Sequence, residues 1–285
     1  MASELTKRVA VAAVGIPLAV LVLWIGGWFL AVLLAAIAAG GAAEFYRLAR
    51  ERGVRPFAAA GAALAAMPVL LTMVTPAAEA WTWRLFVAAA LLIAAAAIFR
   101  RGVAGTPLTV TSVTVFAALF TGGTLLYAML LRFMPVPAAN VAWRSWVGPA
   151  LLAFPITLAW MGDTFAYFGG RAFGRRKLIP AVSPAKTVEG ALAGVIGTTI
   201  VGAVYAHFIF GMWLGVPVGA ATGALIGLIV SPIAQVGDLV ESLLKREAGV
   251  KDSGTLLPGH GGVLDRFDAL FFSIPVTYWL LTLVL

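Results

Sequence analysis

Long apolar stretches, separated by short polar segments, fill most of the chain. A helix that crosses a lipid bilayer needs about 20 apolar residues, and on this rule the sequence predicts about nine such helices. Gly26 and Gly27 alone separate the first two stretches, which could instead form a tight hairpin with one partly re-entrant member. The pattern predicts an all-α, polytopic bundle of membrane helices, with spans at about residues 9–26, 28–43, 57–75, 81–99, 112–133, 149–170, 190–210, 216–236 and 269–285.

Positive charge is concentrated on one side of these predicted spans. Lys and Arg favour short cytoplasmic loops. If the N-terminus is cytoplasmic, the inward-facing segments hold all of the 20 Lys and Arg residues except Arg84, Arg132 and Arg144. The asymmetry therefore predicts a cytoplasmic N-terminus, and it places the polar stretch 242–268 in the cytoplasm.

Composition supports a membrane protein and excludes several other kinds of chemistry. Of the 285 residues, 62% are hydrophobic and 11% are charged, whereas a soluble domain carries roughly 25% charged residues. The sequence contains no cysteine, which excludes disulfides, thiolate nucleophiles and cysteine metal sites. In a membrane protein, a net charge of +8 indicates topology and contact with anionic headgroups rather than binding of nucleic acid.

Two carboxylates precede the polar stretch 242–268. Asp238, Glu241, Ser242 and Lys245 lie at i, i+3, i+4 and i+7, which places them on one face of a helix that continues past the membrane surface. A solvated salt-bridge face would explain Glu241 and Lys245. It explains Asp238 poorly, because Asp238 directly follows an apolar run.

Two more carboxylates follow this stretch. Asp265 and Asp268 share a face at the start of the last predicted span, where capping of the helix N-terminus would explain one of them. Asp and Glu side chains from two adjacent helix ends favour a hard cation such as Mg²⁺. The sequence has only two histidines, His207 and His260, so a zinc site is disfavoured.

A second polar segment precedes the predicted span 190–210. Ser183, Lys186 and Thr187 stand just ahead of a helix N-terminus, where backbone N–H groups favour anions, so this segment predicts a phosphate cradle. Its spacing differs from that of a Walker A loop. Asp163 lies within a predicted span, where a charge is costly. A functional role and a structural pair with a nearby arginine both stay open for Asp163.

Two further features have structural explanations. The segment 44–56 is basic, and we expect a short helix or turn that anchors the chain to anionic lipid rather than taking part in catalysis. Glycines recur at a strict four-residue spacing, which predicts a flat helix face for close packing within the fold or in a dimer. They are Gly215, Gly219, Gly223 and Gly227.

Metal-binding carboxylates and phosphate-binding cations at one membrane face together indicate phosphoryl or nucleotidyl transfer. In such chemistry the protein mainly positions groups and neutralises charge. A phosphate nucleophile is already anionic, so the reaction requires no serine or cysteine nucleophile. We therefore predict a single domain over residues 1–285, in which residues 1–150 are mainly scaffold and residues 151–285 form the catalytic half.

Several of these motifs resemble those of the phosphatidate cytidylyltransferase family, the CDP-diacylglycerol synthases. The similarity extends from about Glu44 to the C-terminus and is densest after Asp163. Val188 departs from the family, whose members often carry Trp there, but the change removes no charged group. The matching motifs are Glu44-Phe45-Tyr46, Asp163-Thr164-x-Ala166-Tyr167, Gly174, Ser183-Pro184-x-Lys186-Thr187, Glu189-Gly190, Ser242-x-x-Lys245-Arg246, Lys251-Asp252, Pro258-x-His260-Gly261-Gly262 and Asp265-Arg266-x-Asp268.

The resemblance implies an enzyme that converts CTP and phosphatidate to CDP-diacylglycerol and pyrophosphate with Mg²⁺, and it leaves a second, monovalent cation open. It also implies a multi-spanning inner-membrane protein, often dimeric, with its active site on the cytoplasmic side and no nucleic-acid partner.

The family's site residues carry over by position. Asp238 and Asp265 would bind the metal, with Asp268 assisting. The phosphates would be held by Lys186, Lys245, Arg246, Lys251 and Arg266, of which Lys245 and Arg266 are predicted to be catalytic. The nucleotide site would be shaped by Ser183, Thr187, Glu189 and His260.

Two rival functions share parts of this pattern. A transporter or channel would favour an inverted repeat with polar residues near mid-membrane in both halves, whereas the charges here gather at one face of the second half. A CTP-dependent lipid kinase of the polyprenol type would use a similar scaffold and metal. It would phosphorylate an alcohol, however, and would need a general base; the dense set of motifs argues against it.

Overall fold

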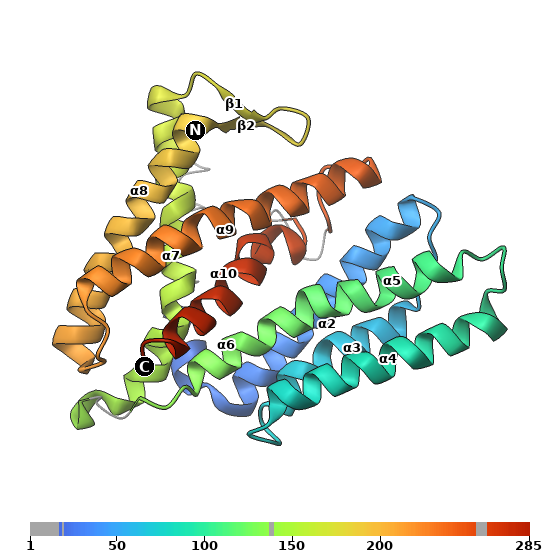
Figure 1. The fold of residues 1–285 in the computed structure, drawn as a ribbon, viewed down its shortest axis with the longest axis horizontal. Coiled ribbons are helices and arrows are strands. Elements are labelled where there is room, and N and C mark those ends of the chain that lie inside the picture. Colours follow the sequence, from blue (N-terminus) through green and yellow to red (C-terminus); the bar gives the residue numbers. More distant parts are fainter. Residues whose placement is uncertain (1–16, 19, 137–139, 255–260) are drawn as a thin grey trace.

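The computed structural model describes residues 17–18, 20–136, 140–254 and 261–285 as a bundle of long helices with one small β-hairpin (Figure 1). Six helical segments in these ranges are long and apolar enough to cross a membrane, so the chain is a polytopic helical membrane protein. The helices are α2 (Gly27–Glu51), α3 (Ala58–Leu71), α4 (Ala78–Arg100), α5 (Pro107–Ala118), α6 (Thr124–Arg132), α7 (Arg144–Phe173), α8 (Val188–Tyr205), α9 (Ala220–Ala248) and α10 (Leu264–Thr282).

The predicted spans correspond well to these helices. Each predicted span from residue 28 onward overlaps a helix, and the span predicted at 9–26 falls largely outside the described residues. Two of the long segments contain π-helical turns: η1 (Leu119–Gly123) joins α5 to α6, and η3 (Ala206–Leu214) extends α8. A short 3₁₀ turn, η2 (Val141–Trp143), precedes α7.

The prediction for segment 44–56 is wrong in its first part. Helix α2 continues unbroken to Glu51, and both Glu44 and Tyr46 are buried within the bundle. The Tyr46 hydroxyl donates a hydrogen bond of 2.7 Å to the carbonyl of Thr114 in α5. The first residues of this segment therefore pack against other helices, and most of its exposed residues come after them.

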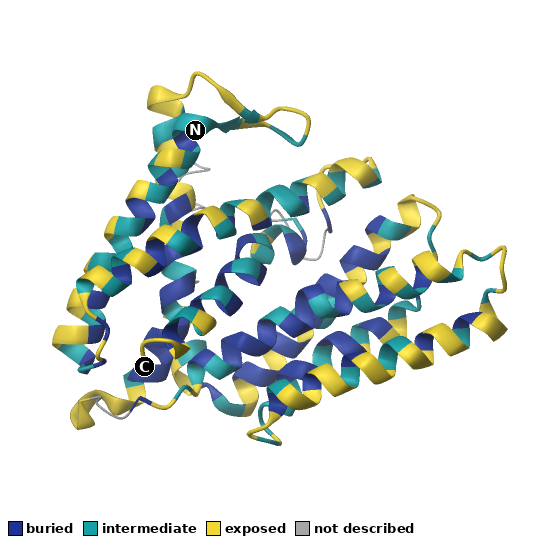
Figure 2. Cartoon of the chain, in the orientation of Figure 1, coloured by how far each residue is buried: buried dark blue, intermediate teal, exposed yellow. Residues whose placement is uncertain are grey.

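Helix α10 lies between two groups of helices (Figure 1). It packs against α9 and α7 on one side and against α6 and α2 on the other. Phe120 of η1 is the aromatic centre of this packing, because its ring centroid lies 5.2 Å from that of Phe271 in α10 and 6.2 Å from that of Phe45 in α2. Figure 2 shows buried residues on the inward faces and exposed ones on the outward faces, where apolar side chains would meet lipid.

A small antiparallel hairpin connects α7 to α8. Strand β1 (Lys177–Ile179) pairs with β2 (Ser183–Thr187), with Lys177 opposite Thr187 and Ile179 opposite Ser183. Helix α8 begins directly after β2, and the Thr187 hydroxyl oxygen accepts a 3.1 Å hydrogen bond from the N–H of Gly190. Thr187 therefore caps the helix, which confirms that the SPAKT segment stands ahead of a helix N-terminus.

Two of the four regularly spaced glycines bring α9 against α8. A Cβ at Gly223 or Gly227 would overlap the backbone carbonyl of Gly202 or Thr198 in α8. The predicted flat face is confirmed at these two positions. It does not extend to Gly215 or Gly219, because α9 begins only at Ala220.

The glycine contact predicts a stability difference between two valine variants. Gly223→Val should lower the free energy of unfolding by about 1–3 kcal/mol, because the added side chain forces α8 and α9 apart. Gly219→Val is the matched control, since nothing lies within 4 Å of a Cβ built at Gly219. Thermal unfolding in detergent measures both variants. Equal midpoints would show that α8 and α9 do not depend on this close approach.

Candidate active site

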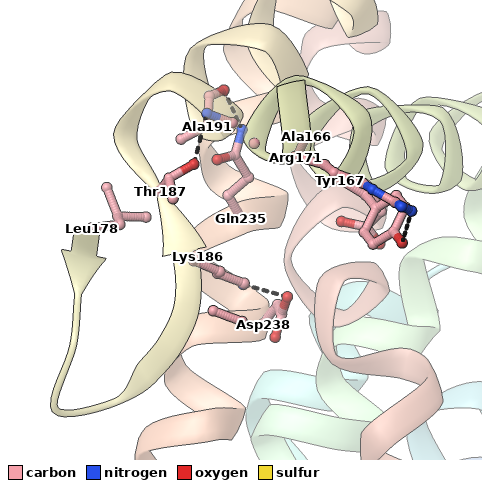
Figure 3. Close-up of a pocket in the computed structure, with 13 residues that line it drawn as sticks. Ala166, Tyr167, Arg171, Leu178, Lys186, Thr187, Ala191, Gln235 and Asp238 are labelled. Atoms are coloured by element: carbon pink, nitrogen blue, oxygen red, sulfur yellow. Dashed lines mark hydrogen bonds and ion pairs between the residues drawn. The ribbon is translucent and has the colours of Figure 1, made fainter. Parts of the chain in front are cut away.

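A cavity of about 390 Å³ lies between α7, the hairpin, α8 and α9 (Figure 3). Two cations, Arg171 and Lys186, and two carboxylates, Asp163 and Asp238, line it together with smaller and apolar side chains. The cavity therefore combines groups that attract phosphate with groups that attract a cation. Its lining residues are Asp163, Ala166, Tyr167, Gly170, Arg171, Leu178, Ala185, Lys186, Thr187, Gly190, Ala191, Gln235 and Asp238.

Helix α7 supplies one wall of the cavity. Asp163, Tyr167 and Arg171 follow one another at four-residue spacing, which places them along one helix face. Arg171 donates a 3.4 Å hydrogen bond to the Tyr167 hydroxyl, and Figure 3 shows both side chains at the cavity. Sequence analysis gave neither residue a site role, although the four-residue spacing from Asp163 was a signal that could have found them.

The hairpin supplies Lys186, whose ammonium group forms an ion pair with Asp238 of α9. Both side chains remain more than a quarter exposed, at 29% and 28%, so they face the cavity rather than the core (Figure 3). On the α8 side of the cavity, the Gln235 amide donates to the carbonyl of Ala191 at 3.2 Å and ties α9 to α8. The structure thus brings together Lys186, Thr187 and Asp238, three of the predicted site residues.

Two further carboxylates, from α7 and α10, lie near this ion pair. Asp163 of α7, Asp238 of α9 and Asp268 of α10 lie close enough for their charges to interact with one another and with that of Lys186. For Asp163, this places the side chain beside Lys186 and Asp238. The Asp268 carbonyl lies beside Gly237, the residue before Asp238, and Asp268 Oδ1 accepts a hydrogen bond of 2.6 Å from the N–H of Ala269.

A second charged cluster lies further along α9. The Lys245 ammonium is 2.5 Å from a carboxylate oxygen of Glu241 and 2.7 Å from one of Asp265. The spacing of Glu241 and Lys245 predicted their pairing, and the ion pair confirms it. The alternative of a solvated face does not hold, however, because the side chains of Glu241, Lys245 and Asp265 are only 2%, 13% and 11% exposed.

The segment between α9 and α10 holds the other oxygen of Asp265. Asp265 Oδ2 accepts hydrogen bonds from the N–H of Ser253 at 2.9 Å, the hydroxyl of Ser253 at 2.9 Å and the N–H of Gly262 at 2.8 Å. Asp265 lies in the first turn of α10, but the Gly262 N–H that it accepts lies ahead of the cap residue, whereas the N–H groups of Val263 and Leu264 bond to Glu44. Capping of α10 by Asp265 stays a prediction. Asp238 and Asp265, both predicted metal ligands, thus have different partners, Lys186 and Lys245.

Glu44 joins this arrangement from α2, and sequence analysis assigned it no part in the site. Its carboxylate is buried and accepts hydrogen bonds from the start of α10 and from Ser253. The motif Glu44-Phe45-Tyr46 was a signal at this position, but it does not reveal the partners of Glu44, which lie more than 200 residues away along the chain.

The remaining predicted residues lie outside the cavity lining. Glu189 accepts hydrogen bonds from the N–H groups of Arg175 and Arg176, at 2.9 and 3.1 Å, and holds the start of the hairpin. Ser183 begins β2. Arg246 donates to the carbonyl of Val250 at 3.3 Å. Three further predictions concern Lys251 and Arg266, which are exposed, and His260, which is outside the described residues.

The donor set around the cavity suits a hard cation. Mg²⁺ prefers oxygen ligands and is commonly held by one or two protein carboxylates together with substrate phosphates. Within the described residues, no group of three or more His, Cys, Asp or Glu side chains could hold a metal ion by itself. A Mg²⁺ held by one or two of these carboxylates would therefore have to complete its coordination with phosphate oxygens or water.

The sequence of the chain is similar to those of known proteins. Residues 6–284 match the cytidylyltransferase family. The chain belongs to this family. A protein from Synechocystis named phosphatidate cytidylyltransferase is 35% identical over 98% of this chain and 97% of its own length. Proteins of the same name from Haemophilus influenzae and Bacillus subtilis are 44% and 43% identical over 45% and 48% of this chain, and over 44% and 49% of their own lengths.

The buried cluster of this cytidylyltransferase-family chain predicts a strong dependence of stability on Lys245. Lys245→Met leaves the carboxylate of Glu241 buried without its cation, a change that typically costs about 3–5 kcal/mol. The double variant Glu241→Gln/Lys245→Met should recover part of the loss, since one buried charge is then gone.

Thermal unfolding in detergent compares these variants with Lys251→Met, which removes an exposed lysine. A midpoint for Lys245→Met equal to that of Lys251→Met would contradict the buried ion pairs.

Proposed function

We propose that the chain transfers CMP from CTP to phosphatidate and forms CDP-diacylglycerol and pyrophosphate. The observation that carries this proposal is the cavity in which Arg171 and Lys186 face Asp163 and Asp238. Membership of the cytidylyltransferase family and the names of the relatives support it. The cavity adjoins apolar helices, so one substrate can remain a membrane lipid.

The reaction is an exchange of one phosphate bond for another. A phosphate oxygen of phosphatidate attacks the α-phosphorus of CTP, and the bond from that phosphorus to the bridging oxygen of the β-phosphate breaks. Arg171 and Lys186 are suited to bind the phosphates and to stabilise the charge that develops on pyrophosphate. No side chain has to supply a nucleophile, because the lipid phosphate is already anionic.

Mg²⁺ is the proposed cofactor. When bound, Mg²⁺ would neutralise charge on the nucleotide phosphates and the leaving pyrophosphate. Asp238, which lines the cavity, is proposed to hold it together with Asp268 of the neighbouring helix α10, and Asp163 lines the same cavity. Asp265 remains a proposed ligand through Oδ1, the oxygen that Lys245 contacts.

The buried position of Lys245 favours a different role from direct phosphate binding. Lys245 is 13% exposed and already contacts two carboxylates, so we assign it to holding Asp265 in place. Arg246, Lys251 and Arg266 are exposed, and they are proposed to attract the nucleotide phosphates from solution. Ser183, at the start of β2, is proposed to shape the hairpin, and Glu189 is proposed to anchor it through the N–H groups of Arg175 and Arg176.

The membrane arrangement of the enzyme is also part of the proposal. The distribution of Lys and Arg supports an active site on the cytoplasmic side of the inner membrane, where CTP is available. We further propose a homodimer, as the family resemblance implies.

Purified protein in detergent–lipid micelles should form CDP-diacylglycerol from CTP and phosphatidate only when a divalent cation is present. The metal requirement follows from the charge that accumulates as pyrophosphate leaves. Thin-layer chromatography with EDTA and Mg²⁺ add-back measures the product, and a polyprenol acceptor serves as the control substrate. Phosphorylated polyprenol in place of CDP-diacylglycerol would refute the proposed reaction.

The carboxylates should differ sharply in their effect on turnover. Asp238→Asn and Asp265→Asn are each expected to lower kcat by at least about 100-fold, because each removes a negative charge that stabilises a cation at the site. Glu247→Gln is the matched control, since Glu247 is an exposed carboxylate further along α9. Near-normal turnover in either aspartate variant would remove that residue from the proposed metal site.

A further inference from the structure

We infer that Glu44 is a positioning residue for the reaction: it fastens the start of α10 to α2 and thereby sets where Asp265 and Asp268 stand. The inference rests on the proposed function for its catalytic consequence, but not for the fastening itself. Glu44 belongs to the scaffold half of the chain, whereas both aspartates belong to the catalytic half. The carboxylate therefore couples the two halves at the active site.

The contacts of Glu44 account for both of its carboxylate oxygens. Oε1 accepts a 3.0 Å hydrogen bond from the N–H of Val263, and Oε2 accepts one of 2.9 Å from the N–H of Leu264. The first N–H groups of a helix have no acceptor within the helix, and a negative charge there is favoured by the helix dipole. Glu44 is 8% exposed, so these donors take the place of water around its carboxylate.

Ser253 links Glu44 directly to Asp265. Its hydroxyl oxygen lies 2.9 Å from Glu44 Oε2 and 2.9 Å from Asp265 Oδ2. A hydroxyl has one proton, so it donates to one carboxylate at a time and holds the two close together. The Arg47 guanidinium, one turn beyond Glu44, donates to the Ser253 carbonyl. Helix α2 thus contacts Ser253 through two side chains, Glu44 and Arg47.

Two glycines leave room for this arrangement. A Cβ at Gly254 or at Gly262 would overlap the Glu44 carboxylate. Neither glycine has a positive φ, so the space beside Glu44, rather than an unusual backbone conformation, explains why both positions lack a side chain. The packing around the carboxylate is therefore as specific as its hydrogen bonds.

The catalytic consequence follows because Val263 and Leu264, which bind Glu44, lie within five residues of Asp265 and Asp268 along the chain. Asp265 is the second residue of α10, and Asp268 lies about one turn further along. A shift of the helix start moves both carboxylates relative to Asp238 and Lys186. Misplacement of reacting groups by about 1 Å can cost about 100-fold in rate.

Glu44→Gln tests the inference, with Glu51→Gln as the matched control on the exposed end of the same helix. Glutamine keeps the size of Glu44 but replaces one acceptor oxygen with an NH₂ group that faces existing donors. Hydrogen exchange of the amides of Val263 and Leu264 should be at least about tenfold faster in Glu44→Gln and unchanged in Glu51→Gln. For CDP-diacylglycerol synthesis, kcat should fall about 10- to 100-fold while KM for CTP stays within about twofold.

Ser253→Ala provides a second variant if Glu44→Gln does not fold. It removes only the bridging hydroxyl and keeps the backbone bonds, so a smaller fall in kcat of about 3- to 10-fold is expected, again with KM for CTP unchanged. Exchange rates in Glu44→Gln equal to those of Glu51→Gln would refute the fastening. Faster exchange with unchanged kcat would refute the positioning role. If wild-type protein makes no CDP-diacylglycerol, the proposed function fails, and the exchange rates still decide the fastening.

Discussion

The burial of carboxylates among apolar helices is the constraint on which the rest of this structure depends. Removing an ion from water costs several kcal/mol unless partners replace the lost hydration. Glu241 and Glu44 are only 2% and 8% exposed, and each has partners that replace water. Glu241 forms an ion pair with Lys245 of its own helix, which also contacts Asp265 of α10. Glu44 accepts hydrogen bonds from the N–H groups at the start of α10. These requirements set the relative positions of α2, α9 and α10 as firmly as apolar packing does.

Helix α9 carries both charged clusters on one face. Asp238 meets Lys186 of the hairpin, and Lys245, about two turns later, meets Asp265 of α10. The candidate site is therefore built mainly on long helices, and the hairpin adds one long side chain, that of Lys186, to the lining of the cavity. Groups held on helices are placed more accurately than groups held on loops, which suits a reaction in which positioning and charge supply most of the catalysis.

Sequence periodicity predicted what lies within one element. The four-residue spacing of Glu241 and Lys245 predicted their pairing, and the position of Thr187 before an apolar run predicted the entry to α8. Contacts between distant segments could not be predicted in this way. Ser253 and Val263 lie 209 and 219 residues from Glu44, and no local pattern states which helices pack together. The burial of Lys245 could not be predicted for the same reason, because it depends on the packing of α9 against α10.

The most direct test of the account follows the phosphorus atoms of CTP. Protein purified in detergent would be incubated with phosphatidate, Mg²⁺ and CTP carrying a radioactive label at either the α- or the γ-phosphate. The account predicts that the α label enters the lipid and that the γ label is released in pyrophosphate. Transfer of the γ label to lipid would contradict cytidylyl transfer and establish a kinase, and label in neither lipid nor pyrophosphate would contradict a CTP-dependent enzyme.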